Sequence, residues 1–252
     1  MRLITLGTGT VVPDPERASA CHWIEDASTR LLVDCGAGAL QSLARSRLPW
    51  EAIDHLVLSH FHADHIAEIP SLLFAMRHGL AEARTRPLAV WGPEGSQQLF
   101  DAWTIAHGPW ITDPGFEVRI EELQPGARAE AGTLSLQVTG TPHTEESIAM
   151  RLEGDGAVLG YTGDTGPSDA LAEFFRDVDL LLAECSLPDD VGSDFHLSPA
   201  SLADLARAAQ VDRLAVTHVY PQLRKNDVAA LIRRAGFDGD IIMMEDGTEL
   251  QV

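Results

Sequence analysis

Cysteine is scarce in this sequence, and the three that occur, Cys21, Cys35 and Cys185, are scattered and form no Cys-x-x-Cys pair. An odd and scattered set argues against a disulfide framework. Apolar runs are short, and none approaches the ~20 residues that a membrane-spanning helix requires. The first segment, Met1 to Leu6, is soon interrupted by Gly7 and Gly9, so we interpret it as a strand rather than a signal peptide. We therefore expect no membrane segment and a cytoplasmic location.

Basic residues are also scarce. The chain has 18 lysines and arginines against 38 acidic residues, which gives a formal net charge of −20, and Lys225 is the single lysine. Because lysine and arginine supply most of the affinity for phosphate backbones, this charge disfavours a long nucleic acid and favours a small-molecule substrate. Solubility, or adaptation to a salt-rich host, is an alternative explanation of the same composition.

The chain has 252 residues, of which 45% are hydrophobic, enough for one sizeable domain or two small ones. Strands are predicted over Arg2–Leu6, Ala20–Ile24, Arg30–Val33, His55–Leu58, Leu88–Trp91, Phe116–Glu122, Leu134–Val138, Ile148–Leu152, Val158–Tyr161, Leu180–Ala183, Arg213–Val216, Ile241–Met244 and Thr248–Val252. Helices are predicted over Ala39–Ser46, Ala67–His78, Gly95–His107, Asp169–Phe175, Pro199–Ala208 and Lys225–Ala235. This mixed order favours α/β layers over a barrel.

The most informative stretch is Ser59-His60-Phe61-His62-Ala63-Asp64-His65, which lies between a predicted buried strand and a predicted helix. A turn at the end of a strand can direct His60 and His62 into one metal site and Asp64 and His65 into an adjacent one. Neutral imidazole and carboxylate suit Zn²⁺, and a turn can leave one coordination position open for water. The alternative is a surface turn that happens to be rich in histidine.

Three further ligand-type residues follow predicted strands. His143 comes after the predicted strand Leu134–Val138, and Asp164 comes after Val158–Tyr161. His218 comes after Arg213–Val216, with only Thr217 between them. Each alone is equally well explained as an ordinary loop residue. The repetition of the pattern at three strand ends is what indicates a shared site.

The series His60-x-His62-x-Asp64-His65, followed by His143, Asp164 and His218, resembles the metal-binding pattern of the metallo-β-lactamase fold superfamily. The resemblance extends from Gly7-Thr8-Gly9-Thr10, through Leu32-Val33-Asp34-Cys35-Gly36, to the last histidine. It implies an α/β fold, a four-layer αββα sandwich of two mixed β-sheets, formed as a single domain by residues 1–252. The site would lie at one edge of the two sheets.

The resemblance also implies a ligand set for two Zn²⁺ ions, with Mn²⁺ or Fe²⁺ as alternatives. One ion would be held by His60, His62 and His143, and the other by Asp64, His65 and His218, with Asp164 between them. Asp34 would support the histidine-rich loop from outside the coordination sphere. A turn-capping role explains Asp34 equally well.

A sixth histidine of the same kind is His196, in Asp194-Phe195-His196-Leu197-Ser198. It resembles the extra histidine of ribonuclease Z and its small relatives, which lies beside the metals and assists the leaving group. An exposed histidine near a helix start is the alternative. Glu184, which follows Leu180–Ala183, is placed to orient His196, although simple solvation of its carboxylate is an equal alternative.

The sequence departs from ribonuclease Z in two respects. The tRNA-processing enzymes carry a long glycine- and proline-rich arm between the positions that match His143 and Asp164. Here those two residues are 21 positions apart, room for one hairpin. The acidic composition also provides no basic track for tRNA. The chain is therefore more similar to the small hydrolases near ribonuclease Z than to the tRNA enzyme.

We therefore expect a dinuclear zinc-dependent hydrolase, most simply a phosphodiesterase acting on small phosphodiesters. A metal-bridging hydroxide would be the nucleophile, Asp64 would bind metal and orient that hydroxide, and His196 would protonate the departing oxygen. The alternatives are an ester, lactone or β-lactam hydrolase with the same centre, a tRNA 3′ processing endonuclease, and a non-enzymatic scaffold that keeps the fold.

The stretch from Phe100 to Ile111 is unusually aromatic for a chain with 6% aromatic residues. Core packing is the favoured interpretation of Trp103 and Trp110. A loop over the site, or a homodimer interface, is the alternative for Trp110. We interpret the remaining histidines as structural or exposed: His22, His55, His78 and His107.

Overall fold

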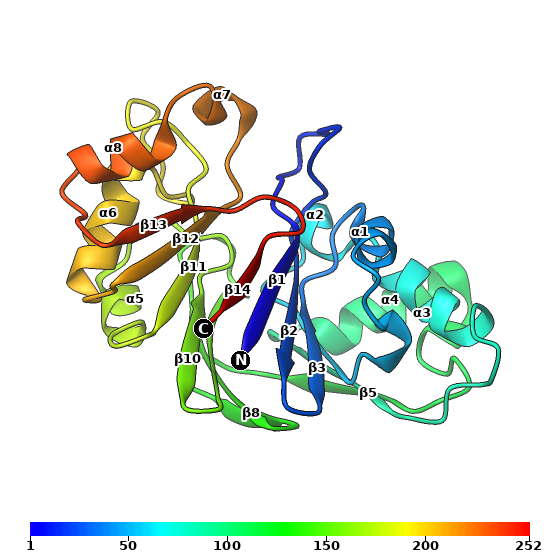
Figure 1. The fold of residues 1–252 in the computed structure, drawn as a ribbon. Coiled ribbons are helices and arrows are strands. Elements are labelled where there is room, and N and C mark those ends of the chain that lie inside the picture. The colour runs from blue at the N-terminus through cyan, green and yellow to red at the C-terminus, as the bar shows by residue number, and fades with distance from the viewer.

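Two seven-stranded β-sheets face each other in the computed structural model, which describes residues 1–252 (Figure 1). The first sheet has the order β14-β1-β2-β3-β4-β5-β6 and the second β13-β12-β11-β10-β9-β8-β7. The strands of the first are β1 (Arg2–Gly7), β2 (Cys21–Asp26), β3 (Thr29–Val33), β4 (His55–Val57), β5 (Leu88–Gly92), β6 (Val118–Glu122) and β14 (Glu249–Gln251). The strands of the second are β7 (Arg128–Ala131), β8 (Leu134–Gly140), β9 (Ile148–Gly154), β10 (Ala157–Tyr161), β11 (Leu180–Glu184), β12 (Arg213–Thr217) and β13 (Asp240–Met243).

Helices cover the outer faces of both sheets (Figure 1). They are α1 (Ala39–Arg45), α2 (Ala63–Ile66), α3 (Ile69–His78), α4 (Ser96–His107), α5 (Asp169–Phe174), α6 (Pro199–Ala208), α7 (Pro221–Arg224) and α8 (Val228–Arg234), with 3₁₀ turns η1 (Trp50–Ala52) and η2 (Pro109–Ile111). None of these helices combines the length and the apolar character needed to cross a bilayer.

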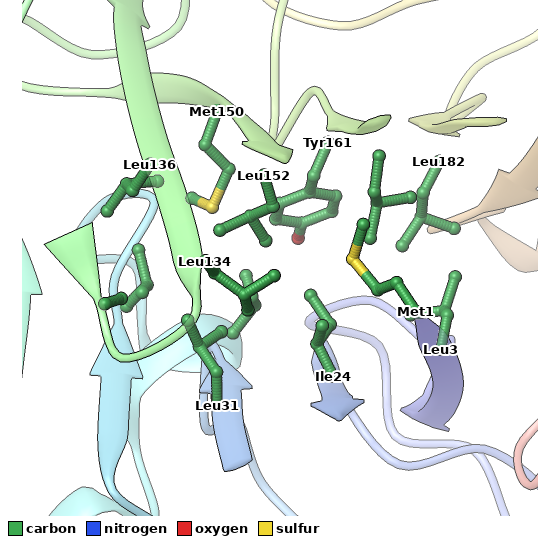
Figure 2. Close-up of a cluster of buried hydrophobic side chains, with 14 of the residues drawn as sticks. Met1, Leu3, Ile24, Leu31, Leu134, Leu136, Met150, Leu152, Tyr161 and Leu182 are labelled. Carbon is green, nitrogen blue, oxygen red and sulfur yellow. The ribbon is translucent and has the colours of Figure 1, made fainter. Parts of the chain in front are cut away.

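Three layers of apolar side chains hold the four layers of structure together. The middle one lies between the sheets, where Leu31 of β3 faces Leu134 and Leu136 of β8 (Figure 2). Because successive side chains of a strand point to opposite faces, Leu3 enters this middle layer while Ile4 packs on the helix side of the first sheet. The predicted αββα sandwich of two mixed sheets is thus confirmed.

Both sheets are mixed, and this determines where the site lies. In the first sheet β3, β4, β5 and β6 are parallel, and in the second β10, β11, β12 and β13 are parallel. Parallel strands end at the same edge of a sheet. The candidate ligands, Asp34 and His196 follow β3, β4, β8, β10, β11 and β12, and β8 has the same direction as β10.

The structure corrects the sequence predictions at four places. The strand β7 was not predicted, because Arg-Ala-Glu-Ala contains no large apolar or β-branched residue and pairs only as an edge with β8. The helix predicted over Ala67–His78 begins at Ile69 as α3, with Pro70 in its first turn, and a separate short helix, α2, precedes it. The helix predicted from Lys225 begins at Val228, because the Asp227 side chain accepts a hydrogen bond from Ala230 N at 2.9 Å. The short helix α7 was also not predicted.

Candidate metal centre

The seven predicted ligands meet at one edge of the sandwich. His60 and His62 lie in the loop after β4, and Asp64 and His65 lie on α2, which begins within the same run. The second sheet contributes His143 after β8, Asp164 after β10 and His218 after β12. Their side chains form two compact groups, in each of which the possible ligand atoms lie within 4.8 Å of one another.

The first group contains His60, His62, His143 and Asp164. His62 Nδ1 lies 3.1 Å from His60 Nε2 and 3.0 Å from His143 Nε2. Asp164 Oδ2 lies 3.9 Å from His60 Nε2 and 3.7 Å from His143 Nε2. Three ring nitrogens and one carboxylate oxygen therefore face a common point.

The second group contains Asp64, His65 and His218. His218 Nε2 lies 3.3 Å from Asp64 Oδ2. Asp164 reaches this group with its other oxygen, since Oδ1 lies 3.4 Å from His65 Nε2 and 3.6 Å from His218 Nε2. Asp164 thus presents one carboxylate oxygen to each group.

Hydrogen bonds on the outer side of four rings fix which nitrogen carries the proton. Nδ1 of His65 donates to Asp34 Oδ2 at 2.7 Å, and Nδ1 of His143 donates to the Phe195 carbonyl at 2.9 Å. The Ser59 and Ser186 hydroxyls donate elsewhere, so they accept from Nδ1 of His60 and His218, each at 3.0 Å. With the Nδ1 atoms engaged on the outer side, the Nε2 atoms of these rings are directed at the site, and in a neutral ring with its proton on Nδ1 the Nε2 atom carries a lone pair.

This donor set fits a metal cation. His65 Nε2 and Asp164 Oδ1 are buried and have no hydrogen-bond partner. Buried acceptors that face one another repel unless a positive charge lies among them. Imidazole nitrogen and carboxylate oxygen are the ligands that Zn²⁺ and similar divalent ions accept. That these seven residues bind metal remains a prediction.

The pKa shifts of the site residues also favour a bound cation. Burial lowers the pKa of His60 and His143, so both rings are neutral and available as ligands. Burial also opposes charge on His65, but Asp164 and Asp34 outweigh it and raise the pKa of His65 well above its usual value. Likewise, His218 and His65 outweigh burial and lower the pKa of Asp164. Positive charge is therefore favoured next to Asp164.

Asp34, expected to support the histidine-rich loop or to cap its own turn, makes several hydrogen bonds to that loop. Its carboxylate accepts from Ser59 N and Ser59 Oγ, each at 2.8 Å, and from His65 Nδ1. Asp34 and His218 have φ values of +55° and +52°. Left-handed backbone at non-glycine residues is costly and tends to gather at functional sites.

His196 and Glu184 lie together beside the two groups. His196 Nδ1 is 3.0 Å from Glu184 Oε1, and the His196 ring is 4.9 Å from that of His143. The bond to Glu184 outweighs burial and raises the pKa of His196. His196 also forms a third possible ligand group with Asp164 and His218, so the geometry allows metal contact as well as proton transfer.

Sequence reasoning missed four side chains around the site. Ser59 and Ser186 orient His60 and His218, and the Tyr161 hydroxyl donates to Asp34 Oδ2 at 2.9 Å. Tyr220 lies against His196 and His218, with ring centroids 6.0 and 5.8 Å away. The only sequence signal was proximity, since Ser59 and Tyr220 are neighbours of the metal ligands.

The two tryptophans of the aromatic stretch lie elsewhere. Trp103 and Trp110 are partly buried and pack against the apolar layer between the first sheet and its helices, as the core interpretation expected. Trp110 contacts Phe74 and His107, and its Nε1 donates to the His107 carbonyl at 2.7 Å. None of these partners is a candidate ligand.

Several known proteins are similar to this chain in sequence or fold. The Beta-lactamase superfamily domain family matches residues 29–219, a segment that contains all seven candidate ligands. The chain is 29% identical to ribonuclease Z of Mycobacterium bovis over 88% of this chain and 87% of that protein. It is 30% identical to an uncharacterized protein of Mycobacterium tuberculosis over 96% of this chain and 88% of that protein.

The fold itself is similar to that of the metallo-beta-lactamase fold protein YhfI from Bacillus subtilis. The TM-score is 0.86 at 24% identity, and the match covers 99% of each chain. The relatives named ribonuclease Z conflict with our expectation from net charge that a long nucleic acid is disfavoured as a substrate. Because the family match spans most of the chain, we conclude that this chain belongs to the metallo-β-lactamase fold superfamily and to its ribonuclease Z-like members.

Proposed function

We propose that this superfamily hydrolase is a dinuclear metal-dependent phosphodiesterase that acts on small phosphodiesters. The observation that carries the proposal is the pair His196 and Glu184, held beside two groups of metal-ligand atoms that share Asp164. A bound pair of divalent ions would supply an activated water and neutralise charge on the phosphoryl group. A proton donor next to that pair suits a reaction whose leaving group is an alkoxide.

Four side chains would have roles in the reaction besides supplying the other metal ligands. Asp64 and Asp164 offer carboxylate oxygens that bind metal and accept hydrogen bonds from the attacking water. Glu184 holds Nδ1 of His196, which leaves Nε2 to give its proton to the departing oxygen. The attacking water gives a proton to the Asp64 carboxylate and forms the new P–O bond. The P–O bond to the leaving oxygen breaks, and that oxygen takes the proton from His196 to leave as the alcohol.

A small substrate is supported by the segment between His143 and Asp164. It contains one hairpin, β9 and β10, joined by Asp155 and Gly156. No arm that could grip a large RNA extends from it, and the net charge of −20 adds long-range repulsion of polyanions.

Precursor tRNA is a second candidate substrate, because relatives at 26–29% identity are named ribonuclease Z. Cleavage of tRNA would use the same metal ligands and the same His196. The two candidate substrates differ in whether this chain, which lacks an arm, can bind a large RNA.

A substrate panel tests the proposal. Purified protein, loaded with zinc or manganese, is assayed on an aryl phosphodiester, a lactone, a β-lactam and a precursor tRNA. We expect the phosphodiester to be turned over with the highest kcat/KM. Activity confined to carbon esters or β-lactams would replace the proposal, and specific cleavage at the tRNA 3′ side would favour the second candidate.

A variant of His196 tests the proposed proton donor. His196→Ala is expected to lower kcat by about 100-fold, since general acid catalysis contributes at roughly this scale. His107→Ala, an exposed histidine, is the matched control and should leave kcat unchanged. Metal content is measured in both, because His196 lies close enough to Asp164 and His218 to bind metal.

A further inference from the structure

Tyr220 is fixed beside the site by its neighbours. It lies two residues after His218, and its backbone N–H donates to the Ser186 carbonyl at 3.3 Å. Its ring meets those of His196 and His218 at interplanar angles of 65° and 74°. The proposed proton donor and a candidate metal ligand thus share this one aromatic neighbour.

The Tyr220 hydroxyl has no hydrogen-bond partner in the chain. Tyr161, the only other tyrosine, is buried and donates to Asp34, whereas Tyr220 is partly exposed. A tyrosine hydroxyl is protonated at neutral pH, since the ordinary pKa of the phenol is about 10. A phenol in this state is a hydrogen-bond donor.

Donors are otherwise scarce around the ligand groups. The ring nitrogens and carboxylates that converge there are acceptors, as the outer hydrogen bonds of the histidines require. The two nearby arginines are engaged, since Arg17 donates to Thr8 and Met244, and Arg224 pairs with Asp14. His196 and Tyr220, which lie against each other here, are side chains that could donate to a bound phosphoryl group.

We infer that Tyr220 is a catalytic residue whose hydroxyl donates a hydrogen bond to a non-bridging oxygen of the phosphoryl group. The inference rests on the proposed phosphodiesterase function. Negative charge builds on that oxygen as the P–O bonds form and break, so a donor placed there stabilises the transition state more than the bound substrate.

Two variants of Tyr220 separate its hydroxyl from its ring. Tyr220→Phe keeps the ring against His196 and His218, and Tyr220→Leu removes both. We expect Tyr220→Phe to lower kcat/KM on an aryl phosphodiester by about 10- to 100-fold, with metal content unchanged. Tyr220→Leu should lose at least as much.

Binding of inorganic phosphate gives a readout that needs no turnover. Calorimetry on metal-loaded protein should show phosphate binding about tenfold more weakly to Tyr220→Phe than to the unaltered chain. Phosphate affinity and kcat/KM within twofold of the unaltered chain, or a loss seen in Tyr220→Leu alone, would overturn the inference and leave the proposed function standing. Failure of the unaltered chain to hydrolyse any phosphodiester would instead refute the proposed function, and the phosphate comparison would still decide whether Tyr220 is a donor.

Discussion

At the scale of single residues, Asp34 shows how one carboxylate can organise a site without facing it. It accepts from the backbone and side chain of Ser59, from Nδ1 of His65, and from the Tyr161 hydroxyl. These bonds link the first sheet, the histidine-rich loop and β10. Removing one acceptor therefore disturbs several donors at once.

Asp34→Asn should weaken metal binding by about 10- to 100-fold, because His65 loses the partner that fixes its tautomer. The variant should also lose about 1–3 kcal/mol of unfolding free energy, since buried donors are left unpaired. Asp26→Asn is the matched control, a buried carboxylate that accepts from Thr133. Metal affinity equal in the two variants, measured by competition with a chelator, would contradict this account.

His22 is a buried histidine outside the candidate ligand groups, and its ring makes no hydrogen bond. It packs edge-on against Tyr161 between the sheets, is 1% exposed, and neither ring nitrogen has a partner. Burial lowers its pKa from 6.5 to about 4. In the window between these values the unfolded chain binds more protons than the folded one, so stability falls as the pH falls.

His22→Leu removes this dependence. The unfolding free energy of the unaltered chain should decline relative to the variant by about 2 kcal/mol between pH 7 and pH 5. Urea unfolding at the two pH values measures it, with His107→Leu as the exposed control. Parallel pH dependence in His22→Leu and the unaltered chain would show that His22 does not contribute.

Much of the candidate site could be predicted from residue type and position. His60, His62, Asp64 and His65 stand out because four ligand-type residues occur within one short turn. Ser186 and Tyr161 could not be recognised in the sequence, because their roles arise from distant contacts. Ser186 contacts His218, which is 32 residues away, and Tyr161 contacts Asp34, which is 127 residues away. A single sequence carries no signal for such pairings.

At the scale of elements, the loop after β3 holds α2 in place. Cys35 N donates to the His65 carbonyl at 2.6 Å, and Glu68 N donates to the Cys35 carbonyl at 3.0 Å. Gly36 permits this approach, because a Cβ there would lie 2.0 Å from the Asp64 carbonyl oxygen. The position of Asp64 and His65 therefore depends on a residue without a side chain.

Gly36→Ala should cost about 1–3 kcal/mol of unfolding free energy, since the loop and α2 must move apart. It should also weaken metal binding, because Asp64 and His65 move with α2. Gly140→Ala is the matched control, since a Cβ there would meet nothing closer than 3.6 Å. Thermal unfolding and chelator competition test both effects, and equal behaviour of the two variants would refute the role of Gly36.

Helices and strands with buried apolar runs could be predicted from the sequence. Those that form only through contacts with another element could not. The strands β8, β10 and β11 carry enough apolar residues to be recognised, whereas β7 exists because β8 pairs with it. The break between α2 and α3 likewise depends on tertiary contacts, since the Glu68 carboxylate accepts from Gly38 and Leu40 at the start of α1.

At the scale of the whole molecule, the two halves of the sandwich meet at the ligand groups. His60, His62, Asp64 and His65 follow the first sheet, and His143, Asp164 and His218 follow the second. Each group contains ligands from both halves. Bound cations would therefore join the sheets as well as serve the chemistry.

The central claim is that these seven side chains bind a pair of metal ions on which hydrolysis depends. Elemental analysis of purified, unchelated protein, run beside a phosphodiesterase assay, tests it most directly. We predict about two equivalents of divalent transition metal per chain, lost with the activity on chelation and restored with it on adding zinc or manganese back. Folded protein that binds no metal after reconstitution, or that hydrolyses phosphodiesters when stripped of metal, would contradict the account.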